Sequence, residues 1–546
     1  MPDEKGISSP AYIDMLPPEL IRHIFLWANA DESHSSPFDP PASVHVSHVS
    51  RRWRDITLSC QELWSDWPRY DKAGYWTDIC HARSLAVPLN LTIMIDKSEL
   101  DLAATARRQL ALDALSRSRT LVVETRGPQY PPVHGALFQG QPPPRLCTVL
   151  IDGFEFRLSD KIWPDTIRVL DMRDACAWRN VDEMIDFFKS IPNLEELTYQ
   201  YNDTDGDRAT VISDLSPSAK HPIRCTPLGR LKRFYLLSNE HSQHWGGFVP
   251  GISMFSYLAL PPTVVLDMGA DLLDIVHWPR SWDDATDAHA LTGPIAENLV
   301  LGTEALQAHF ADAAATGQSY DAITVRDRII QPGLARQVTD SSALLSVLTF
   351  VLPHVDEQVR GGRVSRIACS MYLSVPVFQG ATELDVTRTR ESRHFLHRFP
   401  IFPAVRTLTL AREAVKDFVQ APRFSKYTEL FPALEVIRFK DFNCDEYVKP
   451  VLPPGPGSYK LPLEFYVALL DTLTECNDAG LCDTWRRIEF VGCANGESVV
   501  KRIRDDSRLR RFCGRVVLLC SDSEDYESSN SSDRSCSDRS DSDEGE

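Results

Sequence analysis

The sequence predicts an α/β chain with a short N-terminal helical module, a long irregular solenoid built on a parallel sheet, and a disordered acidic tail. Three observations support this prediction. An amphipathic helical pattern is confined to about residues 12–67, a strand-like motif recurs through about residues 82–520, and residues 521–546 are rich in Ser and acidic residues. With 43% apolar and 25% charged residues among 546, the composition is globular, which excludes collagen-like and wholly disordered chains.

The first helix is predicted in IDMLPPELIRHIFLWA. Pro17 and Pro18 fix φ at a helix start, where the first backbone N–H groups need no helical partner. Apolar residues then recur three or four positions apart, and the following segment is polar and Pro-rich. We therefore expect the helix to end near Asn29 and to bury one stripe, formed by Leu20, Ile21, Ile24, Phe25, Trp27 and Ala28.

A second helical stretch is predicted in VHVSHVSRRWRDITLSC, with one apolar face made by Val46, Val49, Trp53 and Ile56. The segment QELWSDW follows, and its Leu63 and Trp64 can close the open end of the module. Taken alone, these patterns are also compatible with a generic helical hairpin that only packs against the rest of the chain.

Three blocks in order, LPPEL with IF, then VSRRWR, then LW, resemble the F-box, a helical module that binds the Skp-type adaptor of cullin-based ubiquitin ligases. The segment between the first two blocks, Asn29 to Ser43, is longer and richer in Pro than in the usual F-box. In this respect the chain resembles the large F-box families of mushroom-forming (basidiomycete) fungi. The resemblance implies that the module and its adaptor surface are formed by Leu16, Pro17, Leu20, Ile24, Val49, Trp53 and Trp64.

The second region, about Ala82 to Cys520, repeats the skeleton P-x-L-x-x-L-x-h, where h is apolar. A turn, an alternating strand and a helix-like stretch together resemble the unit of a leucine-rich-repeat solenoid, although the spacing is uneven. The helices are expected from Val181 and from Glu464, and an ordinary α/β domain is the alternative. Eight strands are expected, in the segments beginning at Pro144, Pro164, Pro192, Leu228, Leu260, Phe402, Phe431 and Thr484.

The subregion from Asp283 to Arg363 fits this repeat poorly, and we interpret it as a candidate insertion. It keeps a strand-like AITVRD piece and a helix-like SALLSVLTFVL piece. The tail, Ser521 to Glu546, carries ten carboxylates and two arginines, a net charge of −8 out of −18 for the chain. It has too few apolar residues to offset the entropy of folding and is predicted to be disordered.

Charge, hydropathy and cysteine spacing limit which binding partners and which cellular compartment we expect. An acidic chain is a poor general binder of nucleic acid, whose phosphates attract Lys and Arg. The longest apolar run, Ala343 to Leu352, is about half of a bilayer span, and the N-terminus lacks the apolar core of a signal peptide. The 13 cysteines include no CxxC pair. We therefore expect a chain without membrane or metal, with reduced thiols, in the cytoplasm, the nucleus or both.

Signatures of catalysis are mostly missing, since the sequence has no phosphate-binding loop, no G-x-S-x-G elbow and no H-E-x-x-H helix. His394 and His397, with Cys369 upstream, give only a weak indication of a Cys–His nucleophile. We nominate no catalytic, cofactor-binding or metal residue. A hydrolase or transferase hidden between residues 82 and 520 stays open as a rival class.

The sequence as a whole predicts a non-catalytic F-box adaptor that links a substrate on the solenoid to a Skp-type adaptor and a cullin complex. The alternative is a scaffold that acts outside ubiquitination. The substrate and its contact residues cannot be named, because the register that decides which strand residues face outward is unknown.

Overall fold

The computed structural model describes residues 12–30, 42–66, 74–96, 114–126, 142–152, 158, 163–173, 175, 177–201, 211–238, 248–268, 294–326, 329–333, 348–351, 371–388, 399–420, 430–448, 463–478, 484–512 and 514–519. The predicted acidic tail, Ser521 to Glu546, lies outside these residues. None of the helices in the described ranges is long and apolar enough to cross a membrane.

The described part of the chain begins with a helical module, as the sequence predicts. Its first long helix starts at the predicted prolines. Its elements are η1 (Tyr12–Met15), α1 (Pro18–Ala30), α2 (Ala42–Ser47), α3 (Arg51–Ser59), η2 (Gln61–Trp64) and α4 (Gly74–Arg83).

The second helical stretch is not one helix but two, which corrects the sequence prediction. The break follows from Ser50, whose backbone is extended and whose hydroxyl accepts the N–H of Trp53 at 3.1 Å. Serine is a favoured N-cap because its side chain satisfies one of the unpaired N–H groups at a helix start. Val49 therefore lies in the turn between α2 and α3 and not on a helix face.

One sheet of fifteen strands follows the module, in the order β1-β2-β3-β4-β6-β9-β11-β14-β13-β12-β15-β16-β17-β20-β21. All neighbouring pairs are parallel except those of β13, which is antiparallel to both β12 and β14. The strands are β1 (Leu89–Asp96), β2 (Ser118–Arg126), β3 (Thr148–Asp152), β4 (Val169–Arg173), β6 (Glu196–Tyr201), β9 (Arg233–Ser238), β11 (Val265–Met268), β12 (Ala322–Arg326), β13 (Ile329–Gly333), β14 (Leu348–Val351), β15 (Glu383–Arg388), β16 (Thr407–Arg412), β17 (Val436–Lys440), β20 (Arg487–Val491) and β21 (Val516–Leu519).

All eight segments predicted to be strands form strands of this sheet. The first Leu position of the motif closes a turn before six of these eight strands, in which its N–H donates to the carbonyl three residues earlier. This bond is 3.2 Å long at Leu146, 3.3 Å at Leu194 and 3.0 Å at Leu231. The second Leu position lies on the strand and stacks with its neighbours, since Val149, Leu170 and Leu197 are register partners.

The stacked positions form a continuous buried ladder on one side of the sheet. The ladder continues from Leu197 to Phe234 and Leu266, and each of these side chains is fully buried. Burying a side chain of this size contributes roughly 1.5–3 kcal/mol, and no single strand can bury its apolar face without its neighbours. The buried positions of the repeated motif therefore stabilise the sheet along its length.

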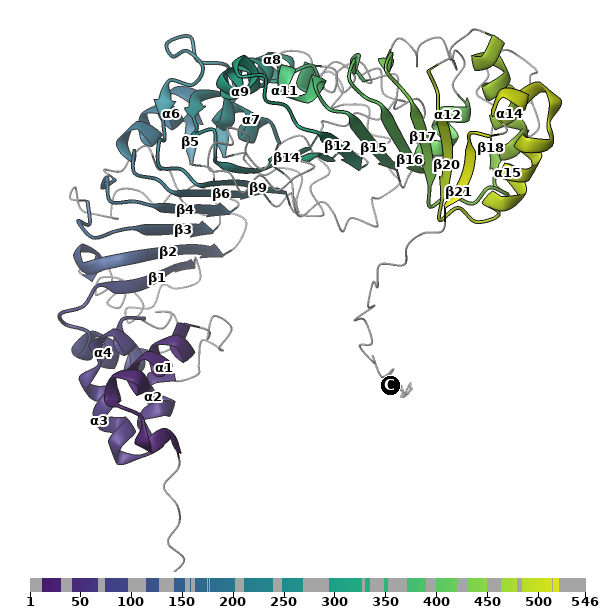
Figure 1. Cartoon of the computed structure of the whole chain (residues 1–546). Coiled ribbons are helices and arrows are strands. Elements are labelled where there is room, and N and C mark those ends of the chain that lie inside the picture. The colour runs from purple at the N-terminus through teal and green to yellow at the C-terminus, as the bar shows by residue number, and fades with distance from the viewer. Residues whose placement is uncertain are drawn as a thin grey trace, which may run out of the picture.

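Figure 1 shows the strands following one another along an arch, with most helices on its outer side. The predicted helices after Val181 and Glu464 are confirmed as α6 and α14. The helices of this part are α6 (Val181–Ser190), α7 (Phe248–Tyr257), α8 (Pro294–His309), α9 (Ala311–Ala315), α11 (Pro376–Gln379), α12 (Glu413–Gln420), α14 (Phe465–Asp478) and α15 (Gly496–Asp505). Shorter strands form three separate pairs: β5 (Trp178–Asn180) with β7 (Ile212–Asp214), β8 (Thr226–Pro227) with β10 (Leu258–Ala259), and β18 (Tyr447–Val448) with β19 (Leu463–Glu464).

The described part of the subregion 283–363 contributes α8, α9 and three strands to the same sheet. The strand-like AITVRD piece contains β12, as predicted. Four residues of the helix-like SALLSVLTFVL piece, Leu348–Val351, form strand β14, and residues 334–347 lie outside the described part. A short apolar run fits a buried strand as well as a buried helix, which explains this difference.

Candidate functional site

Helix α1 carries two apolar faces, and only one of them is covered. Ile21 and Phe25 are buried, and Phe25 packs against the ring of Trp53 with 4.8 Å between ring centroids. On the other face, Leu20 is 50% exposed, Ile24 43% and Trp27 79%. Positions 20, 24 and 27 are spaced i, i+4 and i+7, so their side chains share one side of the helix.

This arrangement corrects the prediction of a single buried stripe on α1. Successive residues of a helix are about 100° apart, so the predicted set spans too wide an arc to face one core. Leu20, Ile24, Trp27 and Ala28 are exposed, and Ile21 and Phe25 alone are buried. The exposed side chains of Leu20, Ile24 and Trp27 are called the open face of α1 below.

The other motif residues divide between surface and core. Pro17 and Val49 are exposed, with 62% of Val49 accessible. Leu16 is half-buried, and its carbonyl accepts a bond of 2.5 Å from the Arg52 guanidinium. Trp64 is fully buried, and its Nε1–H donates to the Thr57 carbonyl at 3.0 Å. Its ring also lies 4.2 Å from the guanidinium carbon of Arg83.

Two exposed residues near this surface were missed as site residues by sequence reasoning. Trp27 has the largest exposed fraction among the exposed large apolar residues of the described chain, and Met15 follows at 70%. The signal for Trp27 was present, because it stands seven positions after Leu20. The apolar pattern includes Trp27 in the buried stripe, because the pattern alone does not show which arc of a helix meets the core.

The module is joined to the sheet by hydrogen bonds to the side chain of Asp66. The Asp66 carboxylate accepts from the Asn29 amide of α1 at 2.7 Å and also from the Asn90 amide of β1. Burial raises the pKa of Asp66, and the two amide hydrogen bonds oppose that rise. The Asn90 N–H also donates to the Ser65 carbonyl at 3.0 Å. One carboxylate thus fixes the first helix of the module to the first strand of the sheet.

Further contacts stiffen the same junction. The Gln61 side chain accepts from the Ala86 N–H at 3.1 Å, and the Arg117 guanidinium donates to the carbonyls of Ser84 and Val87. Hydrogen bonds to backbone carbonyls restrain the path of the main chain as well as the rotamer of the Arg117 side chain. The open face of α1 is therefore held in a defined orientation relative to the sheet.

The structure supplies the register of the sheet that the sequence could not. Side chains that alternate with the buried ladder point to the opposite side, which we call the inner face. On its N-terminal half, Asp171 forms a 2.8 Å ion pair with Arg173. The hydrogen bond that Arg173 donates to Asp171, with the nearby charges of Asp152 and Glu124, raises the pKa of Arg173. The three carboxylates of Asp171, Asp152 and Glu124 outnumber the single guanidinium of Arg173 beside them.

On the C-terminal half of the inner face, a nearly buried carboxylate is shared by two arginines. Glu489 is 2% exposed, and its two oxygens lie 2.8 Å from Arg438 Nε and 2.9 Å from an Arg487 guanidinium nitrogen. Arg438 and Glu489 are register partners on adjacent strands. The pairing compensates for the loss of hydration that an isolated buried charge would suffer.

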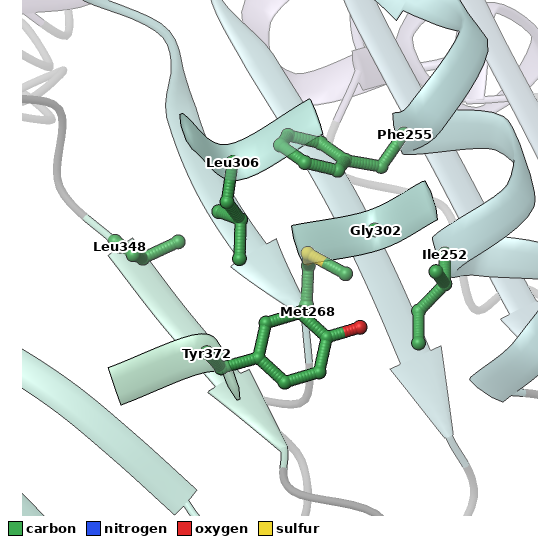
Figure 2. Close-up of a pocket in the computed structure, with 7 residues that line it drawn as sticks. All are labelled: Ile252, Phe255, Met268, Gly302, Leu306, Leu348 and Tyr372. Atoms are coloured by element: carbon green, nitrogen blue, oxygen red, sulfur yellow. The ribbon is translucent and has the colours of Figure 1, made fainter. Parts of the chain in front are cut away.

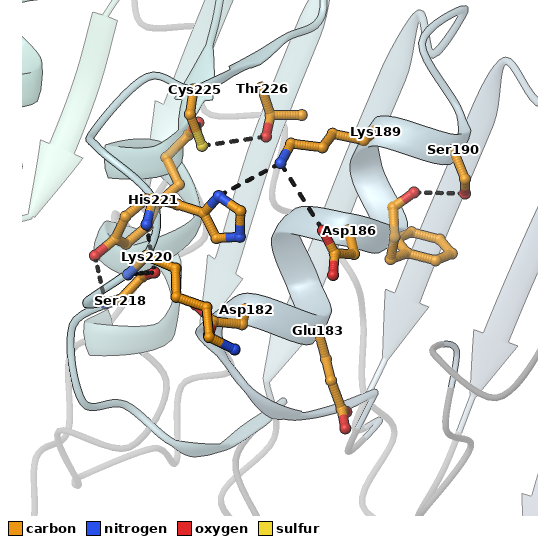
Figure 3. Close-up of polar contacts among 12 residues, drawn as sticks. Asp182, Glu183, Asp186, Lys189, Ser190, Ser218, Lys220, His221, Cys225 and Thr226 are labelled. Atoms are coloured by element: carbon orange, nitrogen blue, oxygen red, sulfur yellow. Dashed lines mark hydrogen bonds and ion pairs between the residues drawn. The ribbon is translucent and has the colours of Figure 1, made fainter.

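A polar cluster joins α6 to the segment that follows β7 (Figure 3). Lys220 pairs with Asp182 at 3.2 Å, and Lys189 lies 3.5 Å from Nδ1 of His221. The Ser218 hydroxyl accepts the N–H groups of Lys220 and His221 at 3.1 and 2.9 Å. The Ser218 hydroxyl also hydrogen-bonds the Asp182 carboxylate, which lowers the pKa of Asp182. The contacts fasten this segment over the helix.

A small apolar pocket lies between α7, α8 and the sheet (Figure 2). The Tyr372 hydroxyl is the main polar group at this pocket, and burial raises the pKa of Tyr372. Such a lining offers few groups to orient a polar substrate. The lining residues are Ile252, Phe255, Met268, Gly302, Leu306, Leu348 and Tyr372.

Among the described residues, no group of three or more His, Cys, Asp or Glu side chains is placed to hold a metal ion. The weakly indicated His394, His397 and Cys369 lie outside the described part of the chain.

Comparison with known proteins bears on the helical module. Residues 13–66 match the F-box-like family. A comparison with the curated proteins finds no match to this chain. F-box domains generally bind Skp-type adaptors, and F-box proteins are generally non-catalytic adaptors. The match covers the residues that form the open face of α1 and about a tenth of the chain.

Proposed function

We propose that this chain is a non-catalytic adaptor that binds a Skp-type adaptor through its F-box-like module and brings a substrate to a cullin-based ubiquitin ligase. The observation that carries the proposal is the open face of α1. Three large apolar side chains, Leu20, Ile24 and Trp27, are exposed on one helix side within a segment that matches the F-box-like family. Exposed apolar surface of this kind marks protein–protein interfaces.

We divide the residues of the module, by their burial, into proposed contacts and proposed supports. Leu20, Ile24, Trp27 and the exposed Val49 are proposed to enter the adaptor interface. Trp64 is fully buried, and Trp53 packs on Phe25, so these two are proposed to hold the module in shape. Aromatic and branched apolar anchors usually dominate the energy of such interfaces.

The sheet is proposed to be a degenerate leucine-rich-repeat-like solenoid that holds the substrate on its inner face. The recurring turn, the buried ladder and the parallel register support this proposal. The inner face offers charged side chains on both halves, including Asp171, Arg173 and Arg438, which a protein substrate can contact.

The proposed mechanism is proximity. A substrate on the inner face would be presented to a ubiquitin-carrying enzyme elsewhere in the complex, so its lysines would meet that enzyme at high effective concentration. This mechanism needs a stiff connection between adaptor and substrate, and the Asp66 junction supports one. The proposed site of action is the cytoplasm, the nucleus or both, where such ligases work.

The test is a pull-down of the purified full chain with a Skp-type adaptor. The Leu20→Asp/Ile24→Asp double variant should lose binding, because a buried unpaired charge is costly at an apolar contact. Ile401→Asp is the matched control, because Ile401 is equally apolar and 56% exposed but lies outside the module. Circular dichroism should show that all three proteins are folded.

The outcomes separate the alternatives. Binding by wild type and by the control, with loss in the double variant, supports the proposal. No binding by wild type would contradict it. Binding without any transfer of ubiquitin in a reconstituted ligase would instead favour a scaffold that acts outside ubiquitination.

A further inference from the structure

Two cysteines face each other at the end of the sheet that is far from the helical module. Cys444 follows β17 and Cys493 follows β20, and these two strands are parallel neighbours. Beyond the strands, Asn443 and Ala494 form an isolated parallel bridge, and the Cys444 N–H donates to the Ala494 carbonyl at 3.0 Å. The backbone thus holds two turns, each with one cysteine, side by side.

Both thiols are reduced, and their side chains interact with each other. In its protonated form, Cys493 also donates its S–H to the Phe439 carbonyl oxygen at 3.3 Å, which limits its rotamers. Cys444 is 4% exposed, whereas Cys493 is only half-buried. A small solute can therefore reach Cys493 first.

The charge of the pair is unevenly shared. The hydrogen bond from the Cys444 thiol lowers the pKa of Cys493 to about 7, against the effects of burial and of the Asp441 charge. The same contact, with burial and the Asp445 charge, raises the pKa of Cys444. Near neutral pH Cys493 is therefore partly a thiolate, and the thiolate is the form that reacts.

We propose that Cys493 and Cys444 form a reversible disulfide when the protein meets a peroxide. The Cys493 thiolate attacks one oxygen of hydrogen peroxide, the O–O bond breaks, and hydroxide leaves and takes up a proton to become water. The sulfenic acid on Cys493 is then attacked by the Cys444 sulfur, which loses its proton as a second water departs. Two thiols are oxidised and one peroxide is reduced to two waters.

The disulfide would bring the two sulfurs to about 2.05 Å, and turns at the ends of strands can move more easily than the strands. The bond would tie the turn after β17 to the turn after β20 across the segment that contains α14. The inference is independent of the proposed adaptor function, since it concerns the opposite end of the sheet.

The test treats the full wild-type chain with about one equivalent of hydrogen peroxide, blocks free thiols and digests with trypsin. The expected product is the peptide Asp441–Lys460 linked to Ile488–Lys501, about 2 Da lighter than the sum of the two reduced peptides. Each of these peptides contains one cysteine. Dithiothreitol should remove the link.

Two variants assign the roles. Cys444→Ser should stop at a sulfenic acid on Cys493 that dimedone traps, and Cys493→Ser should abolish the link. Cys476→Ser is the matched control, because Cys476 is 1% exposed, and it should leave the link intact. If the wild-type chain yields no linked peptide while Cys493 is oxidised further or stays alkylatable, the proposal is wrong. That measurement requires no variant and does not depend on the folding of one.

Discussion

Replacement of Trp27 by alanine should weaken adaptor binding without weakening the fold. The indole is 79% exposed. With about 200 Å² for a whole Trp side chain, about 160 Å² is open to a partner, and at ~25 cal/mol per Å² its burial is worth at most about 4 kcal/mol. Ordering costs and the remaining methyl group reduce this figure. We expect a loss of about 2 kcal/mol, which is roughly a 30-fold rise in Kd.

The assay is isothermal titration of the full chain with a purified Skp-type adaptor, paired with a thermal melt of each variant. Phe25→Ala is the matched control on the same helix, because Phe25 is 3% exposed and lies on the covered face. That change should destabilise the module by about 3–5 kcal/mol. An unchanged Kd in Trp27→Ala, or a lowered melting temperature for it, would refute the assignment of the open face.

Three other changes test separate features. Gly302→Ala should lower the melting temperature, because its new Cβ would lie 2.6 Å from the Tyr372 hydroxyl and 2.7 Å from an Ile252 methyl. An unchanged melting temperature would contradict this and show that the side chains around the pocket move to accommodate the new methyl group. Burial, together with the charge of Arg224, lowers the pKa of His309 from 6.5 to about 3, so the stability from keeping it neutral is full above pH 6.5 and is lost as the pH falls toward 3. The slope is at most about 1.4 kcal/mol per pH unit, and denaturant melts of His309→Phe should lack this component. Asp66→Ala should reduce ubiquitin transfer several-fold while leaving adaptor affinity within about twofold, and hydrogen exchange at the junction should rise; equal transfer would contradict the need for a stiff connection.

Sequence reasoning succeeded where the signal is local. The prolines before α1 act by restricting φ, and each Pro-x-Leu turn before a strand acts through one short-range backbone hydrogen bond. Both features can therefore be predicted from a window of about ten residues. The eight predicted strands illustrate this point, since the same turn and the same buried position recur at Leu194 and Leu197 as at Ile167 and Leu170.

It failed where the answer depends on what packs against an element. Trp27 and Ile21 are both apolar residues on one helix, and only the position of the other helices exposes one and buries the other. The Ser50 cap that divides α2 from α3 was hidden by an apolar period that runs across the break. The pair Arg438 and Glu489 could not be foreseen, because 51 residues and an unknown register separate them.

The chain-adaptor complex is the most direct test of the central claim. Wild-type protein and a purified Skp-type adaptor should be mixed at about 10 µM and passed over a size-exclusion column with light-scattering detection, conditions under which a sub-micromolar complex stays together. The account predicts a single peak whose mass is the sum of one copy of each protein. Two separate peaks with the masses of the individual proteins would contradict it.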